Sequence, residues 1–232
     1  MPPRALDPAG VALVDKPRGP SSFAVVAQIR RVTGARTGHA GTLDPFATGL
    51  LLLLSGRATK LAPCLVGLDK RYRTEIDLCH ATSTGDPEGE VVESHSPPTE
   101  DELGGRLERL RGEIELPIPA ASAVKIGGER AYRLARRGIE VEMPTRRSTV
   151  RALDVIAYTG ETVTLDLRVS SGTYVRSLAI ALDGHCVSLR RTEVGPFSVA
   201  DAVTPDSFTA AALLPESEVL ERVEATRSEA GA

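Results

Sequence analysis

The segment GHAGTLDPFATGLLLLLS, residues 38–55, joins a glycine-rich polar loop directly to five consecutive leucines. A short apolar run without polar interruption is typical of a strand that is buried on both faces. The residues before it, 36–49, include three glycines and a proline, which predicts a loop. We therefore expect a polar loop that carries a His and an Asp and leads into a core strand.

Mixed helices and strands are expected on both sides of this segment. Strands are expected at residues 10–15, 50–55, 71–78, 122–126, 149–158, 161–169 and 186–194. Helices are expected at residues 23–32, 57–66, 99–111, 130–137, 173–182 and 215–226. Several strands follow one another without an intervening helix, so the sheet should be largely antiparallel. The predicted fold class is mixed α/β (α+β).

Cap and turn residues support these boundaries. Ser21 and Ser22 can cap the helix at 23–32, and Gly34 can end it. Thr159-Gly160 can join the strands at 149–158 and 161–169 in a hairpin. Gly138 can end the helix at 130–137.

The composition bounds the class of protein. The chain has 232 residues, of which 41% are hydrophobic and 25% charged, so a packed core is expected and wholesale disorder is not. The apolar run at 50–54 is far shorter than the roughly 20 residues that span a bilayer. The N-terminus lacks the layout of a signal peptide, and three cysteines form no C-x-x-C pair. These features predict a cytoplasmic protein with no membrane contact and no disulfide framework.

The sequence offers no support for a metal or nucleotide cofactor. The four histidines are dispersed, and no spacing matches a structural zinc site. No Walker A, G-x-S-x-G or strand-linked G-x-G-x-x-G motif is present. Nucleotide-dependent and serine-hydrolase functions therefore lack support.

The charge is distributed in blocks. The net charge is −3, but residues 16–73 carry 10 basic and 2 acidic side chains, and residues 117–191 carry 12 and 7. Residues 74–116 carry 3 basic and 12 acidic side chains, and residues 192–232 carry 2 and 8. Such asymmetry suits a polyanion held on one face, although solvated charged faces would give the same blocks.

Three stretches could carry chemistry. Asp44, in the glycine-rich loop beside Pro45, could act as a nucleophile or general base, or could simply cap a turn. Arg176 follows a turn of small residues and could pair with a buried carboxylate, or could lie at the surface. Tyr72 should face opposite to Arg71 and Arg73 in a strand, where it could point into a pocket or into the core.

Taken together, these stretches resemble the TruB family of tRNA pseudouridine synthases. The motifs that carry the resemblance occur in the family's order between about residues 10 and 205. They are Asp15-Lys16-Pro17-x-Gly19-x-Ser21-Ser22, Gly38-His39-Ala40-Gly41-Thr42-Leu43-Asp44-Pro45-x-Ala47-Thr48-Gly49, Ala58-Thr59-Lys60, Lys70-x-Tyr72, Thr84-x-Asp86-x-x-Gly89, Ser122-Ala123-x-Lys125-x-x-Gly128, Arg130-Ala131-Tyr132-x-Leu134-Ala135-Arg136, Ser171-Gly172-Thr173-Tyr174-x-Arg176 and Leu189-Arg190-Arg191-Thr192-x-x-Gly195-x-Phe197.

The resemblance implies a single pseudouridine-synthase catalytic domain with a central, mainly antiparallel sheet and an RNA-binding cleft. It implies an isomerase that converts uridine to pseudouridine in the T-arm of tRNA, at the expected position 55, after the base is flipped out. The expected enzyme is a monomer that uses no cofactor. Attack of the aspartate on C1′, attack on C6 and a glycal route all remain open.

The resemblance also implies roles for individual residues. Asp44 corresponds to the nucleophile, Tyr72 to the tyrosine that stacks on the target base and is proposed as a general base, and Arg176 to the arginine that pairs with the nucleophile. His39 corresponds to the histidine that fills the space left by the flipped base. Further residues are expected to bind or support the substrate; they are Lys16, Lys60, Tyr174 and Leu189.

The chain departs from the family in three places. Leu116 and Ala121 stand where the family usually has Gln and Tyr, and the connection at residues 183–185 is shorter than the family's usual connection. The catalytic domain is expected at residues 1–205 and a helical tail at 206–232, without the C-terminal RNA-binding PUA domain of most bacterial members. A synthase for another RNA, a non-catalytic tRNA-binding or RNA-folding protein and a protein-interaction domain are the competing hypotheses. The last would leave the basic blocks unexplained.

Overall fold

The chain divides into two compact units that are described separately. The computed structural model describes residues 8–122, 124–137, 139 and 141–230. Unit 1 comprises Met1–Tyr72 and Arg190–Ala232, and unit 2 comprises Arg73–Leu189. Two strands, β4 (Lys70–Asp77) and β12 (His185–Val194), have residues in both units because the chain passes between the units within them.

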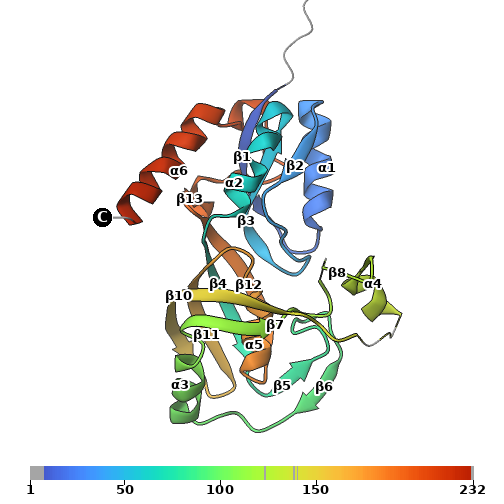
Figure 1. The fold of residues 1–232 in the computed structure, drawn as a ribbon, viewed down its shortest axis with the longest axis vertical. Coiled ribbons are helices and arrows are strands. Elements are labelled where there is room, and N and C mark those ends of the chain that lie inside the picture. The colour runs from blue at the N-terminus through green and yellow to red at the C-terminus, as the bar shows by residue number, and fades with distance from the viewer. Residues whose placement is uncertain (1–7, 123, 138, 140, 231–232) are drawn as a thin grey trace, which may run out of the picture. The chain divides into compact units, whose positions relative to one another are not determined.

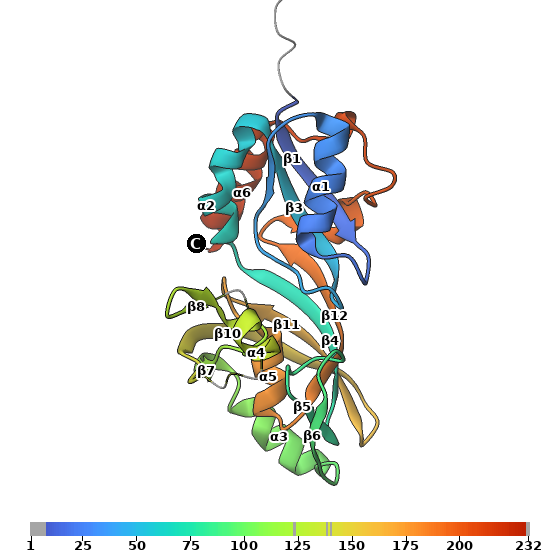
Figure 2. The same ribbon diagram turned by 90° about the vertical axis from the view of Figure 1, so that its right-hand side faces the viewer.

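Unit 1 is built on the leucine strand. β3 (Thr48–Ser55) pairs antiparallel with β1 (Gly10–Lys16) and β2 (Thr37–His39), and parallel with β12. The five leucines at 50–54 are at most 1% exposed, as expected for a strand covered on both faces. Figure 2 shows α1 (Ser22–Thr33) on one side of β1 and β3, and α2 (Ala62–Val66) with α6 (Glu216–Ala230) on the other.

Both sides of this sheet are packed by alternating residues of the same strands. Leu50, Leu52 and Leu54 share a core cluster with Val219 and Val223 of α6. On the opposite side the buried residues of α1 include Val25, Val26 and Ile29. Successive side chains of a strand point to opposite faces of the sheet. A strand that is apolar at every position can therefore pack against a helix on each face.

The ends of the unit 1 elements follow from single residues. The Ser21 side chain accepts from Ala24 N at 3.2 Å, and Gly34 ends α1 in a left-handed conformation with φ of 66°, as predicted. The helix expected at 57–66 is divided into the 3-10 helix η1 (Gly56–Leu61) and α2. Pro63 in the first turn of α2 explains the division, because a proline lacks the N–H that a continuous helix needs.

Two expectations about the strands of unit 1 are wrong. The loop expected at 36–49 contains β2 and the start of β3. No strand was expected after the one at 186–194, but β13 (Phe197–Ser198) follows it and pairs with it. Two further 3-10 helices, η2 (Val199–Asp201) and η3 (Ala210–Ala212), lead to α6.

Unit 2 is built on a long antiparallel hairpin. β10 (Thr145–Tyr158) pairs antiparallel with β11 (Thr162–Val169) and, on its other side, with β7 (Gly112–Pro117). The predicted turn at Thr159-Gly160 is confirmed, with Gly160 at φ of 93°. The strands join in one sheet of order β1-β3-β12-β4-β11-β10-β7, so the predicted mixed α/β fold with a mainly antiparallel sheet is confirmed (Figure 1).

Short elements complete unit 2. The helices are α3 (Glu100–Glu108), α4 (Ala131–Arg136) and α5 (Val175–Ala181). Two small hairpins pair β5 (His80–Thr82) with β6 (Val91–Ser94) and β8 (Lys125–Ile126) with β9 (Glu129–Arg130). The capping box of α3 is formed, although the helix ends three residues earlier than expected.

Other expectations for unit 2 are met only in part. The strand expected at 122–126 is reduced to the two residues of β8. The helix expected at 173–182 begins at Val175, because the residues before it form a turn. Gly138, expected to end a helix, lies outside the described residues. Within the described part of the chain, no helix has the length and hydropathy needed to cross a membrane.

Candidate active site

Asp44 lies in a loop that is fixed by buried neighbours. Leu43 and Phe46 are 3% and 4% exposed and bury the chain on either side of the half-buried Asp44. The buried hydroxyl of Ser22 donates to the Leu43 carbonyl and accepts from the Leu43 N–H, both at 2.9 Å. Ala47 N donates to the Asp44 carbonyl at 3.1 Å and closes a turn. The backbone that carries the predicted nucleophile is therefore held from both directions.

Lys16 holds the same loop through the carbonyl of Pro45, the residue after Asp44. Its side chain is completely buried, and Nζ donates to the carbonyls of Pro17, Pro20 and Pro45 at 2.8, 2.9 and 3.3 Å. Gly19 N also donates to the Pro45 carbonyl, at 2.8 Å. Lys16 was expected to bind or support the substrate, and its described hydrogen bonds go to backbone carbonyls of and around this loop. The arrangement makes Lys16 a positioning residue for the Asp44 loop.

A buried arginine holds the start of the loop. Arg191 is 1% exposed, and its guanidinium donates from Nε to the Leu50 carbonyl at 2.7 Å and from Nη2 to the Gly41 carbonyl at 3.0 Å. Gly49 is required beside it, because a Cβ there would overlap the Arg191 backbone and φ is 103°. Arg191 thus brings a positive charge into the core directly beneath the glycine-rich loop.

His39 lies at the entrance to this loop, at the end of β2. Its ring meets the ring of Phe23 edge to face, with centroids 5.3 Å apart and an interplanar angle of 75°. Burial, and then the charge of Arg191, lower the pKa of His39 below its ordinary value of 6.5. The ring is therefore neutral at neutral pH. Among the described residues, its buried Nδ1 has no hydrogen-bond partner.

Tyr72 is the last residue of unit 1 along β4. The alternation of burial in this strand confirms that Tyr72 faces opposite to Arg71 and Arg73. Tyr72 is 8% exposed, and the described residues offer its hydroxyl no hydrogen bond. Lys60, also expected at the substrate, lies exposed on η1 in the same unit.

Arg176 belongs to unit 2 and is almost completely buried there. It is 2% exposed, and Nη1 lies 3.3 Å from Oδ2 of the buried Asp86. Its guanidinium also donates to the carbonyls of Thr84 at 2.8 Å and Ala121 at 2.9 Å. Asp86 accepts from the Thr84 hydroxyl at 2.6 Å and from Glu88 N at 3.0 Å. The guanidinium is therefore fixed in orientation and has an acidic partner within its own unit.

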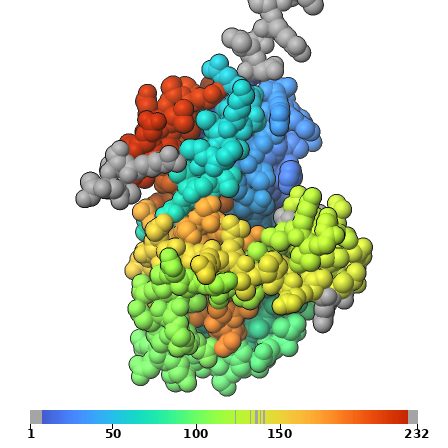
Figure 3. All heavy atoms as spheres, in the orientation of Figure 1, coloured from blue at the N-terminus to red at the C-terminus, as the bar shows by residue number. Residues whose placement is uncertain are grey.

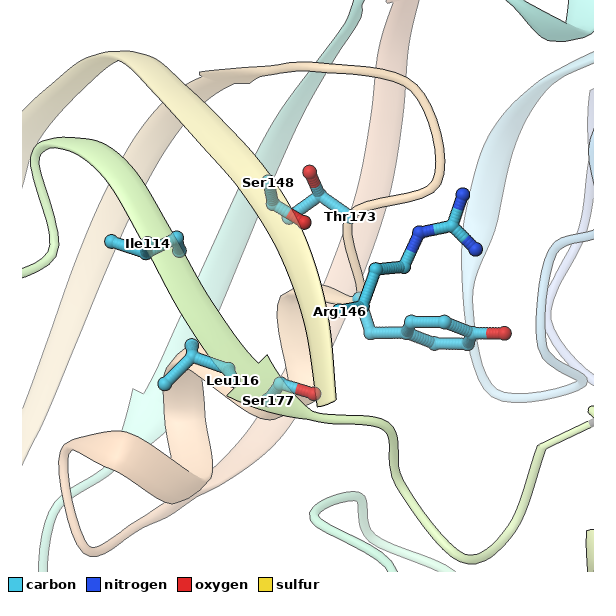
Figure 4. Close-up of a pocket in the computed structure, with 7 residues that line it drawn as sticks. Ile114, Leu116, Arg146, Ser148, Thr173 and Ser177 are labelled. Carbon is cyan, nitrogen blue, oxygen red and sulfur yellow. The ribbon is translucent and has the colours of Figure 1, made fainter. Parts of the chain in front are cut away.

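The turn before α5 places Tyr174 at a small pocket of unit 2. Tyr174 is half-buried and lines this pocket with six other residues, which are Ile114, Leu116, Arg146, Ser148, Thr173 and Ser177 (Figure 4). Figure 4 shows the Arg146 side chain projecting away from Ile114 and Leu116. Gly172, at φ of 79°, leaves room for it, since a Cβ there would overlap the Arg146 guanidinium. Leu189 is 6% exposed on β12.

The structure groups the predicted site residues by unit. Unit 1 contains five of them, which are Lys16, His39, Asp44, Lys60 and Tyr72. Unit 2 contains Tyr174, Arg176 and Leu189. Sequence reasoning gave no role to Asp86 or Arg191, although both lie in motifs that carry the family resemblance. Within the described residues, no group of three or more His, Cys, Asp or Glu side chains could hold a metal ion.

Comparison with known proteins identifies the family. Residues 30–175 match the sequence profile described as TruB family pseudouridylate synthase (N terminal domain), which is well over half of the chain. The chain is 43% identical over 212 residues to the tRNA pseudouridine synthase B of Mycobacterium sp. (strain KMS), covering 86% of this chain and 71% of that protein. It is 42% identical over 235 residues to the tRNA pseudouridine synthase B of Arthrobacter sp. (strain FB24), covering 95% and 75%.

Solved structures agree on the fold. A Cbf5-Nop10-Gar1 complex contains a chain that matches with a TM-score of 0.69 and 25% identity, covering 96% of this chain and 68% of that chain. An H/ACA RNP bound to a substrate RNA containing 2′-deoxyuridine matches with a TM-score of 0.67 and 24% identity, covering 96% and 64%. The resemblance read from the motifs is confirmed: the chain belongs to the TruB family and is a pseudouridine synthase.

Proposed function

We propose that this chain converts uridine to pseudouridine in tRNA, at the expected position 55 of the T-arm, with Asp44 as the nucleophile. Relatives that are 42–43% identical over most of the chain are named tRNA pseudouridine synthase B, which supports a tRNA substrate. The T-arm and the nucleophile rest on the motif resemblance. Tyr72 and Arg176 are proposed as the other two catalytic residues, and His39, Tyr174, Leu189 and Lys60 as substrate contacts.

The anchoring of the Asp44 loop is the observation that carries the proposal. A nucleophile must be presented to the substrate at a fixed position, within an ångström or so, for covalent catalysis to be efficient. Ser22 holds the residue before Asp44, and Lys16 and Gly19 hold the residue after it. Asp44 itself stays half-exposed, which suits a side chain that must reach a substrate rather than cap a buried turn.

The chemistry needs what these residues can supply. The C1′–N1 bond of uridine breaks, the uracil turns, and a bond forms between C1′ and C5, while C5 loses a proton and N1 gains one. Tyr72, whose hydroxyl has no hydrogen bond among the described residues, can stack on the base through its ring and exchange a proton through its oxygen. A uridine in a folded loop must first be flipped out, at a cost of a few kcal/mol.

The proposal is tested with unmodified tRNA transcript and chemical mapping of pseudouridine. The parent protein should convert one uridine in the T-arm, and Asp44→Asn should convert none, because an amide of nearly the same shape is not a nucleophile. Asp201→Asn, an exposed acid on η2, is the matched control and should react like the parent. Conversion at another site would overturn the T-arm assignment. Asp44→Asn activity within tenfold of the parent would overturn the nucleophile.

A further inference from the structure

The exposed side of α1 has an unusual composition for this chain. Three of the four phenylalanines, Phe46, Phe197 and Phe208, are at most 5% exposed, whereas Phe23 on α1 is 72% exposed. Arg30 and Arg31, in the last turn of α1, are also exposed. Figure 3 shows α1, in blue, at the surface of unit 1.

Helical spacing places these side chains on one face. At about 100° per residue, Ala27 and Arg31 lie about 40° and 80° around the helix from Phe23 in one direction. Arg30 lies about 20° from Phe23 in the other direction. We call the four residues Phe23, Ala27, Arg30 and Arg31 the α1 face. The buried residues Val26, Ile29 and Val25 lie about 60°, 120° and 160° around the helix from Phe23, in the direction away from Ala27 and Arg31. The α1 face therefore combines one aromatic ring with two cations along about 12 Å of helix.

No acidic side chain neutralises this face within the described residues. The helix itself contains no Asp or Glu, and neither Arg30 nor Arg31 forms a described ion pair. The acid that contacts α1 is Asp206, which accepts from Gln28 at 2.8 Å about 140° around the helix from Phe23. The positive charge of the α1 face is thus available to a polyanion.

Phe23 connects the face to the active-site loop. Its ring lies edge to face against His39, which begins the loop that continues to Asp44. An aromatic ring that only filled a core would be covered, but Phe23 keeps 72% of its surface in solvent while it touches His39. Such a ring offers an unstacked base a place to stack, and neighbouring arginines can bind its phosphates.

We propose that the α1 face binds the single-stranded part of the RNA loop next to the target uridine, with a base stacked on Phe23 and phosphates on Arg30 and Arg31. This inference rests on the proposed function, because it takes a tRNA loop as the substrate. It adds a nucleotide contact and a phosphate contact that the motif resemblance does not assign.

The test measures binding of the full-length protein to a fluorescently labelled, unmodified T-arm stem–loop RNA at several salt concentrations. The double variant Arg30→Ala/Arg31→Ala should lower the slope of log affinity against log salt by about 1.4 to 1.8, since each lost phosphate contact removes about 0.7 to 0.9. Arg109→Ala, at the C-cap of α3 in the acidic stretch 74–116, is the matched control and should leave the slope unchanged.

The stacking contact has its own variants. Phe23→Ala should weaken binding by about 5- to 150-fold, the range typical of a lost base–aromatic stack. Phe23→Tyr should bind the RNA like the parent, because it keeps an aromatic ring at this position. Val32→Ala, at an exposed aliphatic position on another side of α1, is the control and should bind like the parent. Unchanged affinity in Phe23→Ala together with an unchanged slope in the arginine variant would overturn the inference and leave the face for a protein partner.

The same RNA separates this inference from the proposed function. If the parent converts the stem–loop uridine and all variants bind equally well, only the inference fails. If the parent binds the stem–loop without converting it and the variants lose binding, the proposed function fails and the α1 face stands as an RNA-binding surface.

Discussion

The guanidinium of Arg176 and the carboxylate of Asp86 form a buried ion pair at 3.3 Å, with both side chains at most 6% exposed. Ninety residues separate them in sequence, and the Thr84 and Ala121 carbonyls receive the remaining described hydrogen bonds of the guanidinium. If Arg176 has the catalytic role proposed above, its side chain has lost its conformational entropy before the substrate binds, so less entropy is lost during the reaction.

Replacing Asp86 should therefore damage both stability and turnover. Asp86→Ala leaves Arg176 buried without this partner, and such a loss typically costs about 3–5 kcal/mol of unfolding free energy. Asp86→Asn can still accept from Thr84 and Glu88 N, so it isolates the loss of charge from the loss of hydrogen bonds. Denaturant unfolding and single-turnover pseudouridine formation are the measurements.

An exposed ion pair provides the control for the buried pair. Arg57→Ala removes the ion pair with Glu216 at 2.7 Å, in which the Arg57 side chain is 75% exposed. Its cost should not exceed about 1 kcal/mol. An Asp86→Ala cost no larger than that of Arg57→Ala would show that the buried pair does not stabilise unit 2.

Tyr72→Phe separates two roles of one side chain. The variant keeps the ring and its stacking surface and removes only the hydroxyl. If the hydroxyl exchanges a proton in the reaction, the single-turnover rate should fall at least a hundredfold while the dissociation constant for RNA stays within about twofold. Tyr72→Leu, which also loses the ring, should weaken binding. A near-normal rate in the Phe variant would leave Tyr72 with stacking alone.

Arg191 gives a prediction that can be measured without substrate. Its charge is the second cause, after burial, of the lowered pKa of His39. Arg191→Met should therefore raise the His39 pKa toward its ordinary value without reaching it, as measured by NMR titration with His39→Gln for assignment. Arg191→Lys keeps the charge and should move the His39 pKa less than Arg191→Met does. It loses the planar guanidinium that donates to the carbonyls of both Gly41 and Leu50.

The neighbouring residue provides the control for this titration. Arg190 pairs with Asp15 at 2.7 Å, and no effect of Arg190 on the pKa of His39 is indicated. Arg190→Met should leave the His39 titration where it is in the parent. Equal shifts in the Met variants of Arg190 and Arg191 would mean that a general change of fold, rather than the charge of Arg191, moves the His39 pKa.

The elements predicted best from the sequence are those whose cause is local. The α1 boundaries follow from Ser21 and Gly34, and the β10–β11 hairpin follows from Thr159-Gly160. Of the missed strands, β5 and β6 are short and mostly exposed, and the alternation in β7 spans only Ile114 and Leu116. They form because a partner strand is near in space, and sequence periodicity does not contain that information.

The sequence makes the parts of the candidate site with unusual residue types conspicuous, and it hides the contacts that depend only on pairing in the fold. A His and an Asp in a glycine-rich loop before five leucines are conspicuous in the sequence. Asp86 looks like an ordinary turn acid in a polar stretch, and only the fold brings it to Arg176. Arg191 follows another arginine in a strand, and burial alone distinguishes it from its neighbour.

Lys70 yields a prediction about the pH dependence of stability. Its buried amine donates to the carbonyls of Val66 and Leu68 at the end of α2. Burial, and then the charge of Arg191, lower the Lys70 pKa from 10.5 to about 8, while Asp69 acts in the opposite direction. Below pH 8 both the folded and the unfolded chain hold the proton, so the cost of burying the charge is constant.

Between pH 8 and 10.5 the folded protein has released a proton that the unfolded chain still binds. The unfolding free energy should therefore rise with pH in this window, by at most about 1.4 kcal/mol per pH unit from this group. Lys70→Met should lose this rise, and Lys125→Met, at an exposed lysine of β8, should keep it. Urea unfolding at pH 7.5 to 10.5 measures the unfolding free energy of each variant. The difference between the two values cancels the contributions of the other groups that titrate in this range. Parallel curves for the two variants would mean that Lys70 keeps an ordinary pKa in the folded protein.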